Sequence, residues 1–257
     1  MNNTLNVAAI QAPLAWEDPA ANREYLEQKI NAIQDADLVV LPEMFSTGFS
    51  MNPQGFAEST NGATVQWMKA KAAEKNLAIA GSLMVKEGIT FYNRFYFVTP
   101  DGSITNYDKR HLFTLAGEHK AYKKGESPVT VEYKGFKLFL QICYDLRFPV
   151  FARNTCDYDV VIYVANWPKT RVHAWDTLLQ ARAIENMAYS IGVNRIGKDG
   201  GNYEYTGHSA IYDALGATIA FADEDETTIT ATLSKQHIIE TREKLNFLAD
   251  RDQFLLQ

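Results

Sequence analysis

Short runs of apolar, β-branched and aromatic residues alternate along this chain with longer segments of helical periodicity. The run LVVLP follows Asp37, FKLFLQIC ends at Cys143, and DVVIYVANW begins at Asp159. Apolar runs of this kind are typical of strands that are covered on both faces. Because no internal repeat and no linker rich in Pro, Gly or Ser divides the sequence, the alternation predicts a single α/β domain over residues 1–257 with a layered sheet core.

The same patterns predict the individual elements. Segment 18–33 opens with Asp18 as an N-cap and Pro19 just inside it, followed by apolar residues at helical spacing, which predicts a helix. A Pro-Asp-Gly turn joins two β-rich runs into a hairpin over 89–111. Further helices are predicted over 62–77, 150–157 and 172–189, and a helix or extended tail is predicted over 234–257. Strands are predicted over 6–12, 36–43, 78–85, 136–143, 159–167, 190–197, 209–222 and 227–233.

Composition favours a small-molecule ligand. The net charge of −6 and the pI near 5.4 argue against a nucleic-acid surface, because such binding needs clustered Lys and Arg. No apolar run is long enough to span a bilayer, and the first residues lack the pattern of a signal peptide. Two cysteines, Cys143 and Cys156, could pair, but a disulfide scaffold carries more cysteines in a shorter chain. We therefore expect a cytoplasmic protein that binds neither nucleic acid nor membrane.

Three chemically active residues stand at the ends of predicted strands, namely Glu43, Lys109 and Cys143. If these strands are neighbours, an acid, an amine and a thiol converge at one sheet edge. A carboxylate can deprotonate a thiol, and an ammonium can stabilise the oxyanion formed when the thiolate attacks a carbonyl. Each residue also has a simpler interpretation, because a cysteine after an apolar run is often a small buried hydrophobe and the two charges could be solvated.

A family resemblance favours the catalytic interpretation. The stretches LPEMFSTGF from Leu41, YDKRHLF from Tyr107 and CYDLRFP from Cys143 resemble the three signature stretches of the nitrilase superfamily of carbon–nitrogen hydrolases. The similarity continues through YVANWP, ARAIENMAYSIGVNRIG and GHSAIYDALG, so it covers nearly the whole chain. Within the superfamily the sequence most resembles the ω-amidase branch, which hydrolyses the terminal amide of 2-oxo acid amides such as 2-oxoglutaramate. The resemblance implies a four-layer α-β-β-α sandwich.

The resemblance also implies roles for particular residues. Glu43 matches the general base, Lys109 the oxyanion-stabilising lysine and Cys143 the nucleophile that forms a thioester acyl-enzyme. A second glutamate lies between the lysine and cysteine motifs in this family, and Glu118 fits it better than Glu126, which follows the loop glycine rather than preceding it. The chemistry implied needs no cofactor and no metal.

Residues for substrate binding are predicted near the nucleophile. The N–H of Tyr144 could help to hold the oxyanion, and Arg147 could bind the carboxylate of an ω-amide. Arg147 could equally form a salt bridge, for example with Asp145. Trp167 could form a pocket wall, contribute its backbone N–H, or simply fill the core.

Other sequence patterns give weaker evidence of function than these stretches do. The five histidines show no zinc-site spacing, and GKDGGN, from Gly197, indicates a turn rather than a phosphate-binding loop. Arg182 and Glu185 stand at i and i+3 on a predicted helix, where they could support the site or form a surface pair. The alternative functions are another small-molecule amidase or carbamoylase, or a non-catalytic binding protein. By resemblance we expect a homodimer or higher homo-oligomer, with the tail over 234–257 packing on a partner subunit.

Overall fold

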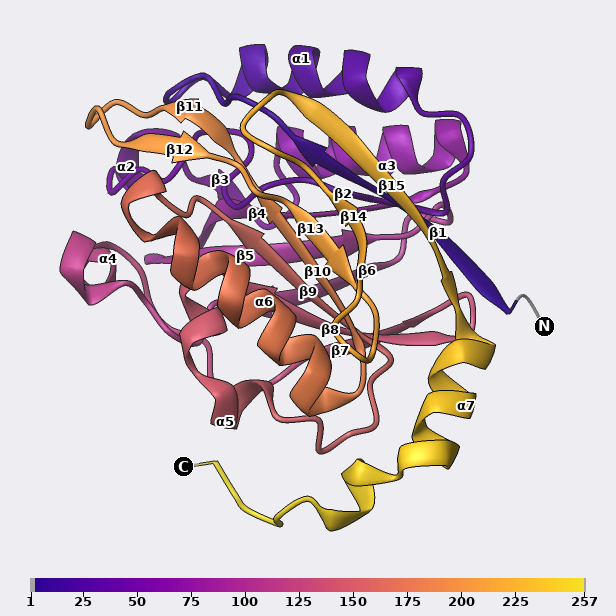
Figure 1. Cartoon of the computed structure of the whole chain (residues 1–257). Coiled ribbons are helices and arrows are strands. Elements are labelled where there is room, and N and C mark those ends of the chain that lie inside the picture. The colour runs from indigo at the N-terminus through magenta and orange to yellow at the C-terminus, as the bar shows by residue number, and fades with distance from the viewer. Residues whose placement is uncertain (1–2, 257) are drawn as a thin grey trace.

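Two β-sheets pack face to face in the computed structural model, which describes residues 3–256 (Figure 1). The first sheet has the order β15-β1-β2-β4-β5-β6, with the short β3 pairing with β4. Its strands are β15 (Thr227–Ser234), β1 (Thr4–Gln11), β2 (Leu38–Val40), β4 (Ala78–Glu87), β5 (Thr90–Val98), β6 (Ile104–Asp108) and β3 (Glu58–Ser59).

The second sheet has the order β14-β13-β10-β9-β8-β7, and β11 and β12 form a separate hairpin. These strands are β14 (Thr218–Phe221), β13 (Ala210–Tyr212), β10 (Tyr189–Asn194), β9 (Val160–Ala165), β8 (Phe136–Ile142), β7 (Thr130–Tyr133), β11 (Ile196–Lys198) and β12 (Glu204–Thr206). The segment predicted as strand over 209–222 is thus two strands of one hairpin, β13 and β14.

Helices cover the outer faces of both sheets. α1 and α3 lie over the first sheet and α6 lies over the second, which confirms the predicted α-β-β-α layering (Figure 1). α7 follows β15 near the C-terminus. The helices are α1 (Pro19–Ala32), α2 (Pro53–Phe56), α3 (Ala63–Lys75), α4 (Glu118–Ala121), α5 (Pro149–Ala152), α6 (Val172–Asn186) and α7 (Lys235–Leu245), with 3-10 turns η1 (Thr114–Ala116), η2 (Cys143–Arg147), η3 (Lys169–Arg171) and η4 (Phe247–Asp250).

Strand β1 illustrates why the sequence forms these layers. Leu5, Val7 and Ala9 belong to the core between the two sheets, whereas Ala8 and Ile10 pack under the helices of the first sheet. Alternate side chains of a strand point to opposite faces, so a strand that is apolar on both faces must be buried on both. The continuous apolar runs of the sequence therefore correspond to the central strands of the sandwich.

The start of α1 agrees with the sequence prediction. The Asp18 side chain accepts a hydrogen bond from Ala21 N at 3.0 Å, and Pro19 occupies the first turn. Both features fix where the helix begins. No helix within residues 3–256 is both long and apolar enough to cross a bilayer.

The strands that lead to the three predicted catalytic residues are not neighbours, so the condition under which their convergence was expected is not met. β4 and β5 separate β2 from β6 in the first sheet, and β8 belongs to the second sheet. β2 is parallel to β4, and β6 runs in the same direction because it is antiparallel to β5, which is antiparallel to β4. The carboxyl ends of β2 and β6 therefore lie at the same edge, and the site forms where this edge faces the end of β8.

Candidate active site

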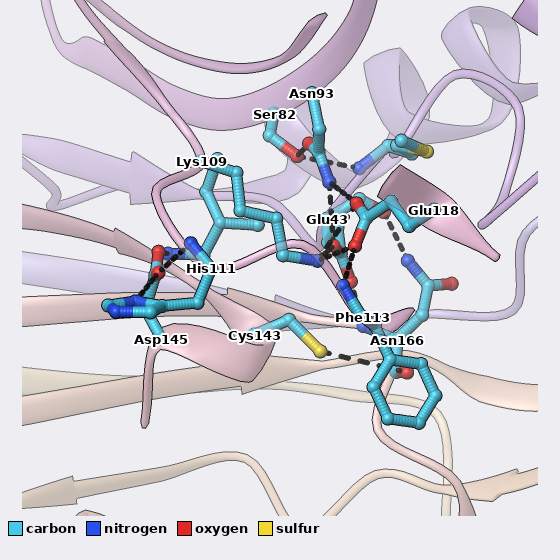
Figure 2. A network of polar contacts seen from close by, with 12 residues as sticks. Glu43, Ser82, Asn93, Lys109, His111, Phe113, Glu118, Cys143, Asp145 and Asn166 are labelled. Carbon is cyan, nitrogen blue, oxygen red and sulfur yellow. Dashed lines mark hydrogen bonds and ion pairs between the residues drawn. The ribbon is translucent and has the colours of Figure 1, made fainter. Parts of the chain in front are cut away.

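The predicted acid, amine and thiol come together between the two sheets (Figure 2). Lys109 Nζ lies 2.8 Å from Glu43 Oε1 and 3.0 Å from Glu118 Oε2, and all three side chains are completely buried. Cys143 approaches this group from the second sheet. The structure thus brings together four residues that are distant in sequence, and it leaves one ammonium shared between two carboxylates.

Glu118, and not Glu126, lies against Lys109. Glu118 begins the short helix α4, and its Oε2 accepts a hydrogen bond from Phe113 N at 2.5 Å. Glu126 is exposed to solvent. The loop between the lysine and cysteine segments therefore folds back so that Glu118 faces Lys109.

Two asparagines and a serine, which were not among the predicted site residues, complete the polar network. Asn93 Nδ2 donates to Glu43 Oε1 at 2.8 Å and to Glu118 Oε1 at 3.1 Å, and its own Oδ1 accepts from Ser82 Oγ. Asn166 N donates to Glu43 Oε2 at 2.8 Å. These bonds hold both carboxylates in place without neutralising them. Asn166 stands inside the YVANWP stretch, and Asn93 is a lone amide in an aromatic strand, so both had a visible sequence signal.

Cys143 lies at a sharp turn immediately after β8. Its φ of +45° is in the left-handed region, which costs a non-glycine residue about 1–3 kcal/mol. Its Sγ lies 3.9 Å from Asn166 O, and its side chain is almost buried. Strain of this kind persists only where the surrounding structure fixes it, and here it directs the sulfur out of the strand and toward Glu43 and Lys109.

Burial and charge shift the protonation equilibria of the site. Burial raises the pKa of the Cys143 thiol well above its ordinary value; Glu43 adds to this rise and Lys109 opposes it. Burial also raises the pKa of Glu118. Burial alone would lower the pKa of Lys109, but the charges of Glu118 and Glu43 outweigh it and raise that pKa. The thiol is therefore protonated at neutral pH, and it needs a base when it attacks.

A cavity of about 680 Å³ opens next to Cys143. This is within the usual range for small-molecule sites. Aromatic side chains form much of its wall, including Trp16, Phe49, Phe113, Tyr144, Trp167 and Tyr205. The β11–β12 turn, from Asp199 to Tyr203, contributes the rest of one side. GKDGGN is thus a turn, as predicted, but it also borders the cavity, which the sequence analysis did not foresee.

Trp167 is a wall of this cavity, and one of its predicted roles is wrong. Its backbone N–H donates to Asn194 Oδ1 at 2.7 Å, so this group is already used within the protein. Its indole N–H donates to Arg171 O, which holds the ring against the cavity. Trp167 therefore contributes its ring face rather than its backbone.

Two arginines face the cavity. The Arg147 guanidinium stacks 4.9 Å from the centre of the Trp167 ring, and that of Arg171 lies 5.1 Å from the Phe113 ring. Over residues 3–256 neither guanidinium pairs with a carboxylate. The alternative in which Arg147 pairs with Asp145 is therefore wrong, because Asp145 bonds to Tyr107, His111 and Ile142 instead.

The ion pair expected on α6 also reaches the site. Arg182 Nη1 contacts Glu185 Oε1 at 2.9 Å, and its Nη2 donates to Leu146 O in the turn that contains Cys143. Arg182 thus stabilises the turn that contains Cys143 through a hydrogen bond from α6.

Cys143 and Cys156 are both free thiols. Within the described part of the chain, no three His, Cys, Asp or Glu side chains are grouped to hold a metal ion.

A buried thiol beside a carboxylate and an ammonium, at the bottom of a cavity, is equipped for nucleophilic attack on a carbonyl carbon. The family model of carbon–nitrogen hydrolases matches residues 6–243, so the chain belongs to this family, and it is a hydrolase of carbon–nitrogen bonds other than peptide bonds. This confirms the resemblance drawn from the three sequence stretches.

Individual relatives are similar over their full length. The omega-amidase YafV of Yersinia enterocolitica is 44% identical, over 99% of this chain and 99% of that protein. The 2-oxoglutaramate amidase of Bacillus subtilis (strain 168) is 32% identical, over 95% and 96%. The crystal structure of XC1258 from Xanthomonas campestris, a CN-hydrolase superfamily protein with an arsenic adduct in its active site, matches with a TM-score of 0.96 at 41% identity and covers 99% of both chains.

Proposed function

We propose that this protein is an ω-amidase that hydrolyses the terminal amide of small 2-oxo dicarboxylic acid monoamides, such as 2-oxoglutaramate and 2-oxosuccinamate. The observation that carries the proposal is a cavity that combines a nucleophile site at Cys143 with the unpaired guanidinium groups of Arg147 and Arg171. An amide at one end and a carboxylate at the other match these two features. The relatives named above support the same substrate class.

In the first half of the reaction, Cys143 attacks the amide carbonyl while its proton passes to Glu43. Lys109 and the N–H of Tyr144 stabilise the negative charge that develops on the carbonyl oxygen. Glu43 then returns the proton to the leaving nitrogen, ammonia departs, and a thioester remains on Cys143. The raised pKa of the thiol makes this transfer necessary, because little thiolate exists before attack.

In the second half, water replaces ammonia in the site. Glu43 takes a proton from the water, the hydroxyl adds to the thioester carbonyl, and Lys109 again stabilises the oxyanion. The intermediate collapses to the carboxylic acid, and the thiolate regains a proton from Glu43. Glu118 keeps the Lys109 ammonium directed at the reacting oxygen through its two hydrogen bonds with Nζ. No step requires a cofactor.

The remote carboxylate gives the site its selectivity. A guanidinium stacked on an aromatic ring is held in one orientation and keeps its N–H donors free for a carboxylate. Arg147 and Arg171 both have this arrangement. We propose that Arg147 binds the carboxylate and that Trp167 packs against the carbon chain of the substrate.

We also propose a cellular compartment and an oligomeric state for this protein. Both cysteines are free, which suits a reducing compartment such as the cytoplasm. We further propose a homodimer or higher homo-oligomer, since apolar side chains are exposed on α6, on the β13–β14 hairpin and near the C-terminus, including Ile184, Leu215, Phe221 and Phe247.

An ammonia-release screen tests the proposed function. The substrates are 2-oxoglutaramate, 2-oxosuccinamate, glutamine, asparagine, N-carbamoyl amino acids and simple nitriles. We expect kcat/KM to be highest for the 2-oxo acid amides, by about 100-fold or more over simple nitriles, which have no carboxylate for the guanidinium groups to bind. Glutamine and asparagine keep the carboxylate but add an ammonium group, which the like charges of Arg147 and Arg171 disfavour, so kcat/KM should be lower for them too. Preference for a carbamoyl amino acid or a nitrile would instead place the protein in another branch of the family.

A single variant, compared on two amides with and without a carboxylate, tests the carboxylate site. In Arg147→Leu, kcat/KM for 2-oxoglutaramate should fall about 10- to 100-fold, the effect of losing a charged hydrogen bond. The same variant should hydrolyse propionamide, which has no carboxylate, within about threefold of the original protein. An equal loss for both amides would mean that Arg147 supports the fold of the site rather than the substrate.

A further inference from the structure

The carboxylate of Asp145 is completely buried and has four hydrogen-bond donors around it. Its Oδ2 accepts from Tyr107 OH at 2.8 Å and from Ile142 N at 3.0 Å. Its Oδ1 accepts from His111 N at 3.0 Å and lies 2.8 Å from His111 Nδ1. Because a carboxylate is the acceptor, Nδ1 carries the proton in this contact. A buried side chain with this number of bonds is held in a single position.

These donors belong to the two segments that carry the reacting groups. Tyr107 and His111 stand two residues before and after Lys109, whereas Ile142 is directly before Cys143. Lys109 extends from the first sheet and Cys143 from the second, so Asp145 joins the two sheets at the level of the site (Figure 2). Its bond to Ile142 N also closes the turn in which Cys143 adopts its left-handed backbone conformation.

The ring of His111 is fixed from two further sides. It stacks on Phe148 with ring centres 3.7 Å apart and planes inclined by 5°, and it meets Phe151 edge-on at 5.2 Å. Both phenylalanines follow the nucleophile turn, on or next to α5. The loop after Lys109 is therefore held to the Cys143 segment by a polar contact to Asp145 and by an aromatic stack.

This connection bears on catalysis because the attacking sulfur and the oxyanion-binding ammonium come from different sheets. A catalytic group must be held within about 0.5 Å of its productive position. A displacement of 1 Å can cost about 100-fold in rate. A single carboxylate that accepts hydrogen bonds from both segments is a direct means of keeping that distance constant.

We propose that Asp145 and His111 are positioning residues that set the spacing between Cys143 Sγ and Lys109 Nζ. They touch neither the substrate nor the reacting atoms. The polar contact between His111 Nδ1 and Asp145, rather than the aromatic stack alone, carries this effect. The proposal rests on the proposed function insofar as Cys143 and Lys109 perform the chemistry.

Two substitutions of His111 separate the polar contact from the stack. Asn can place an amide N–H near the position of Nδ1 but has no ring, and Phe keeps the ring but cannot donate. We expect His111→Phe to lower kcat for the amide substrate about 10-fold or more with KM within about twofold, because oxyanion stabilisation depends on the spacing. His111→Asn should retain at least about a third of kcat. His111 is partly exposed, so neither change is expected to prevent folding.

A second measurement needs no substrate. In a Cys156→Ser background, which removes the exposed thiol, the rate of Cys143 alkylation by iodoacetamide reports on the surroundings of the sulfur. It should fall severalfold in His111→Phe and stay close to the original rate in His111→Asn. If the protein hydrolyses none of the amides, the proposed function fails, and alkylation still tests the positioning.

The opposite ranking overturns the proposal. If His111→Phe retains kcat and alkylation rate while His111→Asn loses them, the aromatic stack alone positions the loop. If both variants lose them equally, or both retain them, the polar contact has no separate role, and Asp145 serves only the turn at Cys143.

Discussion

The Cys143 thiol combines two properties that usually oppose each other, because it is a nucleophile and yet it is held in its protonated form. Burial is the largest cause of its raised pKa, and the nearby carboxylates add to it. The ammonium of Lys109 only partly compensates. Reactivity must therefore come from proton transfer to Glu43 during attack rather than from a standing thiolate.

Replacing the base should change how Cys143 reactivity depends on pH. In Glu43→Gln with Cys156→Ser, we expect alkylation of Cys143 at pH 7 to be about 100-fold slower than with Glu43 present. Burial still keeps the thiol protonated in this variant, so the rate should rise about tenfold per pH unit to beyond the ordinary thiol pKa of about 8.5. Alkylation at pH 7 that does not depend on Glu43 would show that Glu43 is not the base.

The residues of the site differ in how well the sequence predicted them. Glu118 was distinguished from Glu126 by the family pattern, and the structure places it against Lys109. Asn93 was missed, although it shares a face of β5 with Phe95 and Phe97, which are buried between the sheets. An amide at such a position needs partners inside the protein, and this reasoning could have identified it. Its particular partners, which come from distant segments, could not be inferred.

At the scale of elements, local patterns predicted the strands and helices but not the pairing of the strands. Continuous apolar runs correctly indicated β8 and β9, and the N-cap at Asp18 correctly indicated α1. The sequences of β2, β6 and β8 do not indicate to which sheet each strand belongs, because sheet membership depends on contacts between distant residues. The strands are therefore not neighbours, although the residues at their ends do meet.

The β11–β12 hairpin gives a second example at this scale. Its glycines indicated a turn, and the structure confirms one. The turn borders the cavity because the hairpin projects beyond the end of β10, and Asp199 fixes its shape by accepting from Gly201 N and Tyr203 N. Turn chemistry can be inferred from sequence, whereas the direction in which a hairpin projects depends on packing.

At the scale of the whole molecule, the exposed apolar side chains suggest an assembled protein. Ile184 on α6 lies against Gly216 in the β13–β14 turn, next to Leu215, and about half of each of these two apolar side chains is exposed. Contiguous apolar surface of this kind is typical of protein interfaces. Residues 234–256 add exposed apolar groups, of which Phe247 is 58% exposed.

Light scattering at micromolar concentration should therefore give at least twice the chain mass of 28.9 kDa. Ile184→Glu should shift the protein toward the monomer, since it places a charge in a desolvated interface. Ile89→Glu is the matched control, because Ile89 is 96% exposed at the β4–β5 turn of the first sheet, and this change should leave the mass unchanged. A monomeric original protein contradicts the proposed assembly.

If the Cys143 thiol forms the acyl-enzyme, ammonia release should depend on it, and Cys143→Ala tests this. We expect turnover to fall about 10⁴-fold or more, as for the loss of other catalytic nucleophiles. The melting temperature should stay close to that of the original protein, and Cys156→Ala should remain fully active. Undiminished ammonia release by folded Cys143→Ala would show that Cys143 is not the nucleophile.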